Sequence, residues 1–165
     1  MKVMVFLGSE SDFGVVEDAL VLLKDFGVPF GLEVTSAHRS PERTLRLIES
    51  AEAGGTEVFI AVAGKAAHLA AVVASRTVKP VIGVPVESEA LAGLDALLST
   101  VQMPMGIPVA TMALGRPGGS NAALLAVEIL ALKDKALRTK LVAYRTKVAD
   151  KVEAASLKIK IKEKL

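Results

Sequence analysis

The sequence predicts one α/β domain, in which helices cover both faces of a parallel β-sheet, followed by a C-terminal helix. Short apolar runs rich in β-branched residues alternate with stretches of helical periodicity, which is typical of repeated βαβ units. The strand-like runs are apolar throughout, as expected for a sheet that is buried on both faces. A length of 165 residues without an internal repeat or a low-complexity linker fits a single α/β domain.

Glycine and proline mark the limits of the predicted elements. Gly27 ends the first helix, and Gly54 and Gly55 end the second. Pro41 stands where the first turn of that second helix tolerates proline. The predicted strands are 3–7, 32–35, 58–63, 81–84 and 109–112, and the predicted helices are 15–26, 41–53, 66–75, 90–99 and 121–132.

Residues 133–165 follow the α/β domain of residues 1–132 and are predicted to form a helical arm. Its apolar residues recur at spacings of three and four, which indicates an amphipathic helix. That stripe can pack back on its own domain, but packing on a neighbouring subunit explains it at least as well. Residues 157–162 alternate with period two, which leaves strand, frayed helix and added tail open. The stripe consists of Leu137, Leu141, Tyr144, Val148, Val152 and Ala155.

The composition argues against several classes of protein. No apolar run approaches the roughly 20 residues that span a bilayer, and we see no signal-peptide pattern. The chain has no cysteine and only two histidines. We therefore expect no membrane partner, no disulfide, no metal site and a cytoplasmic location.

The net charge of +2 conceals an uneven distribution. Residues 1–132 carry 9 Lys/Arg against 14 Asp/Glu, whereas residues 133–165 carry 11 against 4. A basic tail can bind nucleic acid, but only 4% of the residues are aromatic and none interleave with the lysines to stack bases. We favour a solvated helix face and expect no nucleic-acid partner. An acidic domain and a basic tail can also attract each other between subunits.

Ligands of open parallel sheets bind beyond the carboxyl ends of the strands, near the point where strand order reverses. The first loop expected there is Gly-Ser-Glu-Ser-Asp at residues 8–12. Gly8 lets the backbone approach a ligand, while Ser9 and Ser11 offer hydroxyl groups at a helix N-terminus that favours anions. Asp12 can accept hydrogen bonds from a ribose diol. An ordinary capped turn explains the same residues equally well, since Ser and Asp are preferred N-caps.

The second loop, residues 36–42, reads Ser-Ala-His-Arg-Ser-Pro-Glu. Arg39 can bind a phosphate through two parallel hydrogen bonds. Histidine is the side chain suited to proton transfer at neutral pH, which makes His38 a candidate acid/base group. Ser40 can simply cap the helix that starts at Pro41.

The third loop, residues 63–68, reads Ala-Gly-Lys-Ala-Ala-His, with small residues that admit a ligand close to the backbone. We favour a satisfied structural histidine over a functional group for His68. Gly64 and Lys65 do not belong to a Walker A loop, because the required spacing is absent. Together the three loops indicate a phosphate-and-sugar site with one good proton-transfer group.

At these loops the sequence resembles the N5-carboxyaminoimidazole ribonucleotide mutase family, and the resemblance continues to about Lys133. Several long segments in the right order are far more specific than any single motif. The segments are GSESD (8–12), SAHRSPE (36–42), AGKAAHLA (63–70), PVIGVPV (80–86), LAGLDALLSTVQMPMGIPVAT (91–111) and NAALLA (121–126).

The resemblance implies a flavodoxin-like three-layer α/β/α sandwich with a central five-stranded parallel sheet. It also implies a homo-octamer with sites between subunits, C-terminal helices that reach neighbours, and no cofactor. His38 would be the catalytic acid/base for a carboxylate shift on a ribonucleotide in purine synthesis, and residues 102–104 would line the site. The substrate-binding residues would be Gly8, Ser9, Ser11, Asp12, Ser36, Ala37, Arg39, Gly64, Lys65, Ala66, His68 and Leu69.

The sequence departs from the family pattern near the third loop. Val62, Lys65, Ala70 and Ala71 replace residues with the backbone properties of glycine or proline, and Ala96 stands where serine is commoner. Two other functions therefore remain open beside the mutase. One is direct carboxylation of aminoimidazole ribonucleotide, and the other is an impaired or engineered oligomeric scaffold that keeps the fold.

Overall fold

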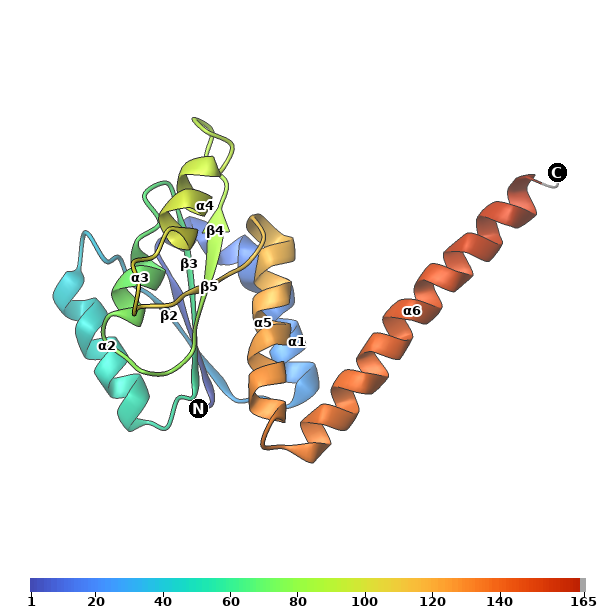
Figure 1. The fold of residues 1–165 in the computed structure, drawn as a ribbon, viewed down its shortest axis with the longest axis horizontal. Helices are drawn as coiled ribbons and strands as arrows, with labels where there is room; N and C mark the ends of the chain where they lie inside the picture. The colour runs from blue at the N-terminus through green and yellow to red at the C-terminus, as the bar shows by residue number, and fades with distance from the viewer. Residues whose placement is uncertain (164–165) are drawn as a thin grey trace.

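A five-stranded parallel sheet forms the centre of the protein (Figure 1). The computed structural model describes residues 1–163, so the last two residues of the predicted arm, 164–165, lie outside it. The strand order is β2-β1-β3-β4-β5, and every neighbouring pair is parallel. This order is that of the flavodoxin-like fold, which confirms the predicted fold class. The strands are β1 (Val3–Leu7), β2 (Phe30–Val34), β3 (Val58–Gly64), β4 (Val81–Val86) and β5 (Ala110–Thr111).

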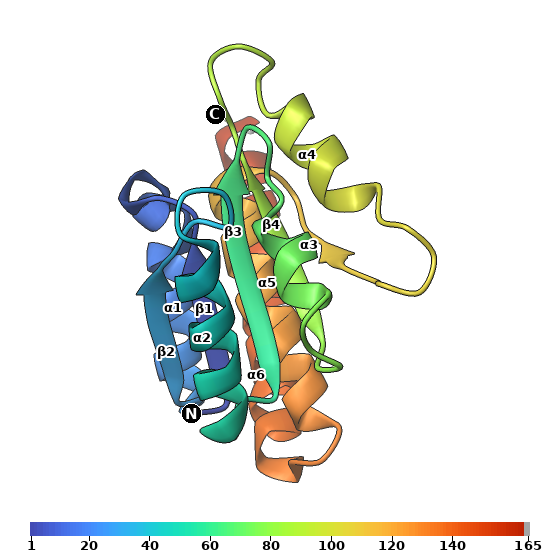
Figure 2. The same ribbon diagram turned by 90° about the vertical axis from the view of Figure 1, so that its left-hand side faces the viewer.

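Helices cover both faces of the sheet and make the three layers of the sandwich. In Figure 2, α2 and α3 lie in front of the strands, and α1 and α5 lie behind them. A short 3-10 helix, η1 (Glu10–Asp12), precedes α1. The α-helices are α1 (Phe13–Phe26), α2 (Pro41–Ala53), α3 (Leu69–Ala74), α4 (Leu94–Val101), α5 (Gly115–Ala131) and α6 (Lys135–Glu163).

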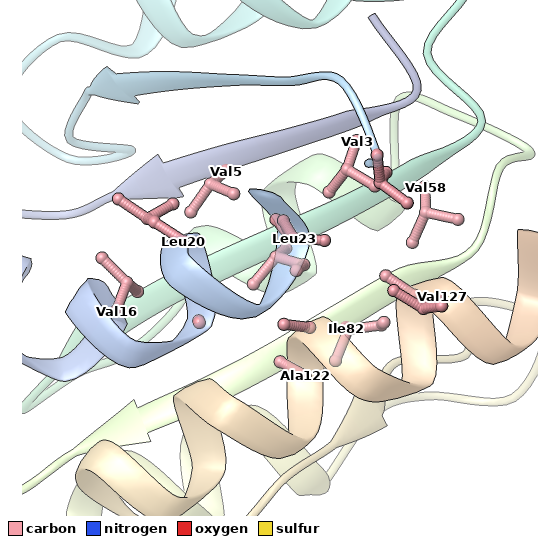
Figure 3. Close-up of a cluster of buried hydrophobic side chains, with 14 of the residues drawn as sticks. Val3, Val5, Val16, Leu20, Leu23, Val58, Ile82, Ala122 and Val127 are labelled. Carbon is pink, nitrogen blue, oxygen red and sulfur yellow. The ribbon is translucent and has the colours of Figure 1, made fainter. Parts of the chain in front are cut away.

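Successive side chains of each strand enter opposite cores, as strand geometry requires. On β1, Val3 and Val5 are buried with Leu23 of α1 in the core that α1 and α5 share (Figure 3). Phe6, the residue after Val5, belongs to the core of α2 and α3, where its ring stacks on Phe59 with 5.9 Å between centroids. The sheet is buried on both faces, which explains the uniformly apolar strands.

The predicted fifth helix is longer than expected, because α5 begins at Gly115 rather than at residue 121. The segment Gly-Arg-Pro-Gly-Gly-Ser at 115–120 resembles a loop by composition, but its glycines serve helix packing. A Cβ on Gly119 would lie 2.1 Å from the carbonyl oxygen of Val15 on α1. A Cβ on Gly118 would lie 1.7 Å from the carbonyl oxygen of Ala113. The backbones approach so closely that only glycine fits.

Other limits differ by a few residues. The third and fourth helices begin later than predicted, at Leu69 and Leu94, because the residues before them form loops. Each loop contains a non-glycine residue at positive φ, Lys65 at 55° and Ala92 at 47°. The fifth strand shortens to Ala110–Thr111, and the second runs over Phe30–Val34 instead of 32–35.

Helix α6 packs on its own domain only with its first turns, and Figure 1 shows the rest leaving the body. Leu141 is buried, and the ring of Tyr144 lies 5.8 Å from that of Phe26. Val148 and Val152, further along the predicted stripe, are exposed. Residues 157–162, whose conformation the sequence left undecided, are part of helix α6. No helix within residues 1–163 is long and apolar enough to cross a membrane.

Replacing Gly119 by alanine should destabilise the protein. The added Cβ would clash with the carbonyl of Val15, and separating α1 from α5 disrupts the core between them. We expect a loss of about 1–3 kcal/mol in the free energy of unfolding, measured by denaturant titration. Gly14→Ala in α1 is the matched control, because its Cβ would meet open space; an equal loss in both variants would refute the close-packing explanation.

Candidate active site

A cavity of about 1150 Å³ lies at the carboxyl ends of β1, β2, β3 and β4. The strand order reverses between β1 and β3, where parallel sheets place their ligands. The three predicted loops meet there, and the predicted site residues line the cavity, with the exception of His68 and of residues 102–104. These lining residues are Gly8, Ser9, Ser11, Asp12, Ser36, Ala37, His38, Arg39, Gly64, Lys65, Ala66 and Leu69.

The loop after β1 is held by hydrogen bonds of its own residues. The Ser9 N–H donates to Oδ2 of Asp12 at 3.0 Å, and the Ser11 N–H donates to Oγ of Ser9 at 3.4 Å. These bonds cap η1, so the capped-turn interpretation is correct. The same side chains line the cavity, so capping does not exclude ligand binding. Glycine suits this position, because a Cβ on Gly8 would lie 3.3 Å from Cβ of Ala63 on β3, a tight contact.

Asp12 is a buried carboxyl group, with 7% of its surface exposed. Burial raises its pKa above the ordinary value, because removal from water disfavours the charged form. The N–H of Ser9, the hydroxyl of Ser11 and the charge of Arg39 oppose this rise in pKa without cancelling it. The ionised carboxylate is therefore costly in the free protein. Additional donors, such as the hydroxyls of a sugar, would stabilise it.

Arg39 connects the loop after β2 with the loop after β1. Its Nη2 donates to the carbonyl of Gly8 at 3.2 Å, and its Nε donates to Oγ of Ser36 at 3.4 Å. Ser40 stands at the start of α2 but makes no capping bond with its side chain. Instead its Oγ donates to the carbonyl of Ser36 at 3.1 Å and accepts from the Ser36 N–H at 3.2 Å. Ser40 thus occupies the N-cap position of α2, as the alternative interpretation of the sequence had it, but its side chain closes the turn that presents His38 and Arg39 instead of capping the helix.

The two histidines of the chain form a pair. His38 Nε2 lies 2.9 Å from His68 Nδ1, and the rings meet edge to face at 83° with centroids 5.0 Å apart. One of these nitrogens donates and the other accepts, so the tautomers of the two rings are linked. His68 is satisfied, as predicted, but by His38 and at an exposed position rather than within the core. A proton-transfer residue at the cavity thus has a defined partner.

Ser99 on α4 holds the loop after β3, although the sequence analysis did not identify it. Its Oγ accepts from the N–H of Ala67 at 3.1 Å and lies 3.3 Å from the carbonyl of Lys65. Lys65 lines the cavity in the left-handed region, with φ of 55°. That conformation suits glycine and is unfavourable for a residue with a Cβ.

The loop after β4 forms a rim that the sequence analysis also missed. The rule used for the other loops would have found it, since it follows a predicted parallel strand. The Ser88 hydroxyl donates to the carboxylate of Asp95 at 3.2 Å, and Glu87 and Glu89 add two more carboxylates. Residues 102–104 do not belong to the cavity lining in the single chain. The missed lining residues are Val86, Glu87, Ser88, Glu89, Ala90 and Asp95.

The fold and the cavity together define the class of protein. It is a doubly wound α/β protein whose switch-point cavity has hydroxyl and arginine donors and a histidine pair, groups suited to a small anionic ligand and to acid–base chemistry. A sequence model of the AIR carboxylase family matches residues 2–151. The chain belongs to this family.

The relatives agree with this assignment over nearly the whole length. The N5-carboxyaminoimidazole ribonucleotide mutase of Methanocaldococcus jannaschii is 54% identical over 158 residues, which cover 96% of this chain and 97% of that protein. The mutase of Escherichia coli K12 is 48% identical over 151 residues, 92% and 89% of the two chains. A crystal structure of Treponema denticola PurE superposes with a TM-score of 0.86 at 30% identity and covers 94% of this chain and 96% of that one.

Replacing Asp12 by asparagine should not destabilise the protein at neutral pH and should raise its melting temperature slightly. The raised pKa means that ionised Asp12 opposes folding above that pKa, whereas asparagine keeps an acceptor for the Ser9 N–H without the charge. The difference should shrink as the pH falls through the raised pKa and disappear below the ordinary aspartate value of 3.8, where the carboxyl is protonated in both states. Thermal unfolding from pH 3 to pH 8 measures it.

Glu57→Gln is the control with the opposite sign. A hydrogen bond from Lys2 lowers the pKa of Glu57, so its ionised form stabilises the fold at neutral pH. This variant should be less stable than the parent at pH 7, and the difference should vanish on acidification through the folded pKa. An Asp12→Asn variant that is clearly less stable at pH 7 would show that the carboxylate is favourable where it lies.

Proposed function

We propose that the chain is an N5-carboxyaminoimidazole ribonucleotide mutase of purine biosynthesis, an isomerase that moves a carboxylate from the exocyclic nitrogen to a ring carbon. The observation that carries the proposal is the His38–His68 pair at the cavity of a chain about half identical to proteins of that name. A proton must leave the ring carbon in this reaction, and His38 is the cavity residue suited to take it near neutral pH.

Substrate binding would use the loops after β1 and β2. Ser9 and Ser11 offer hydroxyls, and Arg39 has guanidinium N–H groups beyond the two bonded to Gly8 and Ser36. These groups suit a phosphate, because arginine pairs with phosphate through parallel hydrogen bonds. Asp12 suits the ribose hydroxyls, which would donate to its buried oxygens.

The proposed reaction has two steps that balance. In the first, the bond between the nitrogen and its carboxylate breaks, carbon dioxide leaves, and the nitrogen regains a proton. In the second, the ring carbon attacks the retained carbon dioxide, and His38 accepts the proton that this carbon loses. One proton is gained and one is lost, so a single acid/base group suffices and no cofactor is needed. Carbon dioxide must stay in place between the steps, which requires a site that excludes water.

The two alternative functions are less well supported. Direct carboxylation of aminoimidazole ribonucleotide uses the same fold, but relatives of about 50% identity carry the mutase name. The impaired-scaffold alternative rested on departures from the family pattern. Val62 is buried in the core with α1 and α5, and Ala70 is buried with α2 and α3. Among the departures, Lys65 alone lines the cavity.

We further propose that the enzyme is a cytoplasmic homo-octamer that binds its nucleotide at sites between subunits. Its support is the apolar surface that the single chain leaves open. Leu94, Leu98 and Val101 recur at helical spacing on α4 and are exposed. The stripe of α6 continues beyond the domain through Val148 and Val152. The acidic domain and basic arm add complementary charge.

His38→Asn should abolish turnover while preserving the fold and nucleotide binding. A positioned acid/base group contributes about 10²–10⁴-fold, and we expect kcat to fall by at least 10²-fold. Steady-state assays with the N-carboxylated substrate measure kcat. Calorimetric titration with aminoimidazole ribonucleotide, together with thermal unfolding, serves as the control. A variant that retains more than about a tenth of the parent rate contradicts the role of His38.

Removing the end of α6 should reduce the oligomer. A chain that ends at Lys147 keeps Leu141 and Tyr144, which pack on the domain, and loses the exposed part of the stripe. We expect a lower mass by light scattering at an unchanged melting profile, because the deleted part contacts no core of its own chain. A monomeric full-length protein would refute both the octamer and the site between subunits.

A further inference from the structure

Lys65 has a backbone conformation that is unfavourable for any residue with a Cβ. Its φ of 55° lies in the left-handed region, where a Cβ is crowded. Gly64, the residue before it, ends β3 opposite Val86 of β4, so Lys65 is the first residue beyond this part of the sheet. A strained residue that lines a cavity is a candidate for function, because strain persists where a site benefits from it.

Lys65 is also a cation without an anionic partner. None of the ion pairs among residues 1–162 includes it. Arg39, the other cation of the cavity, is partly engaged with Gly8 and Ser36. Lys65 is exposed and lines the cavity, so its charge is available to an anionic ligand there.

The acidic rim makes this charge important for an anionic ligand. The register of β3 and β4 continues from Gly64 and Val86 to Lys65 and Glu87, which therefore start neighbouring loops. Glu89 lines the same cavity. Without Lys65, this side of the cavity would present carboxylates to a ligand that itself carries negative charge, and repulsion would weaken binding.

Each of the two cations shares a loop with one histidine of the pair: Arg39 follows His38 after β2, and Lys65 precedes His68 after β3. Arg39 follows β2 and contacts the loop after β1, whereas Lys65 follows β3, beside β4. His68 comes three residues after Lys65 and bonds to His38. We propose, on the basis of the proposed function, that Lys65 binds the carboxylate that shifts while Arg39 binds the phosphate at the other end. The reacting ring then lies between them, within reach of His38.

This role makes Lys65 a specificity-determining residue. It favours a carboxylated ribonucleotide over the uncarboxylated one, which has its phosphate at Arg39 but no carboxylate for the ammonium. It also slows the release of carbon dioxide, because an interaction that is stronger in the ground state than in the transition state opposes the chemical step. Removing Lys65 therefore raises both KM and kcat.

Two substitutions separate charge from backbone strain. Lys65→Gln removes the charge and keeps a side chain at positive φ, and Lys65→Gly removes both. Lys79→Gln is the matched control, since Lys79 is exposed and precedes β4 at the opposite edge of the sheet. Each variant is titrated by calorimetry with 4-carboxyaminoimidazole ribonucleotide and with aminoimidazole ribonucleotide, and kcat and KM are measured with the N-carboxylated substrate.

Both Lys65 variants are expected to bind the carboxylated ligand about five- to tenfold more weakly, with less than a twofold change for aminoimidazole ribonucleotide. Lys65→Gly is expected to raise kcat and KM, and Lys79→Gln to change neither. Equal weakening for both ligands, no weakening, or a fall in kcat for both Lys65 variants would overturn the proposal. A parent protein that binds neither ribonucleotide would instead refute the proposed function.

Discussion

The parallel pairing of β1 with β2 on one side and with β3 on the other determines where the candidate active site lies. Leu7, the last residue of β1, lies opposite Val34, the last residue of β2, and opposite Val62, two residues before the end of β3, so the chain leaves the three strands at nearly the same level of the sheet. Loops that are distant in sequence therefore start side by side. Because of this, Arg39 reaches the carbonyl of Gly8, and His38 reaches His68.

Two residues of the site, Asp12 and Lys65, are less favourable for folding than other residues would be at the same positions. Asp12 is buried with a raised pKa, and Lys65 has a positive φ. Local hydrogen bonds limit the cost of each: the Ser9 N–H donates to the carboxylate of Asp12, and Ser99 holds the residues around Lys65. Such exceptions to local preference are expected at functional sites, where ligand binding rather than folding favours the residue.

The pattern of apolar residues along the chain correctly predicted those helices and strands in which the apolar residues are the ones that pack in the core. The apolar strands, the stop at Gly27 and the proline in the first turn of α2 appear in the structure as expected. The segment 115–120 was misjudged because Gly118 and Gly119 look like loop residues, whereas contact with other backbone makes them necessary in α5. The late start of α4 was missed because positive φ at Ala92, within the predicted helix, cannot be inferred from an alanine.

The sequence by itself determined the fold class, the order of the elements and the residue types of the three loops, since these depend on periodicity and on neighbours along the chain. The tertiary structure decided the rest. It pairs His68 with His38, and it adds the acidic rim around Glu87. It uses the side chain of Ser40, which the sequence suggested as a helix cap, to close the turn before α2. It also divides the stripe of α6 into a packed part at Leu141 and an exposed part at Val148. These features depend on distances between residues far apart in the chain, which only the register of the strands and the packing of the helices establish.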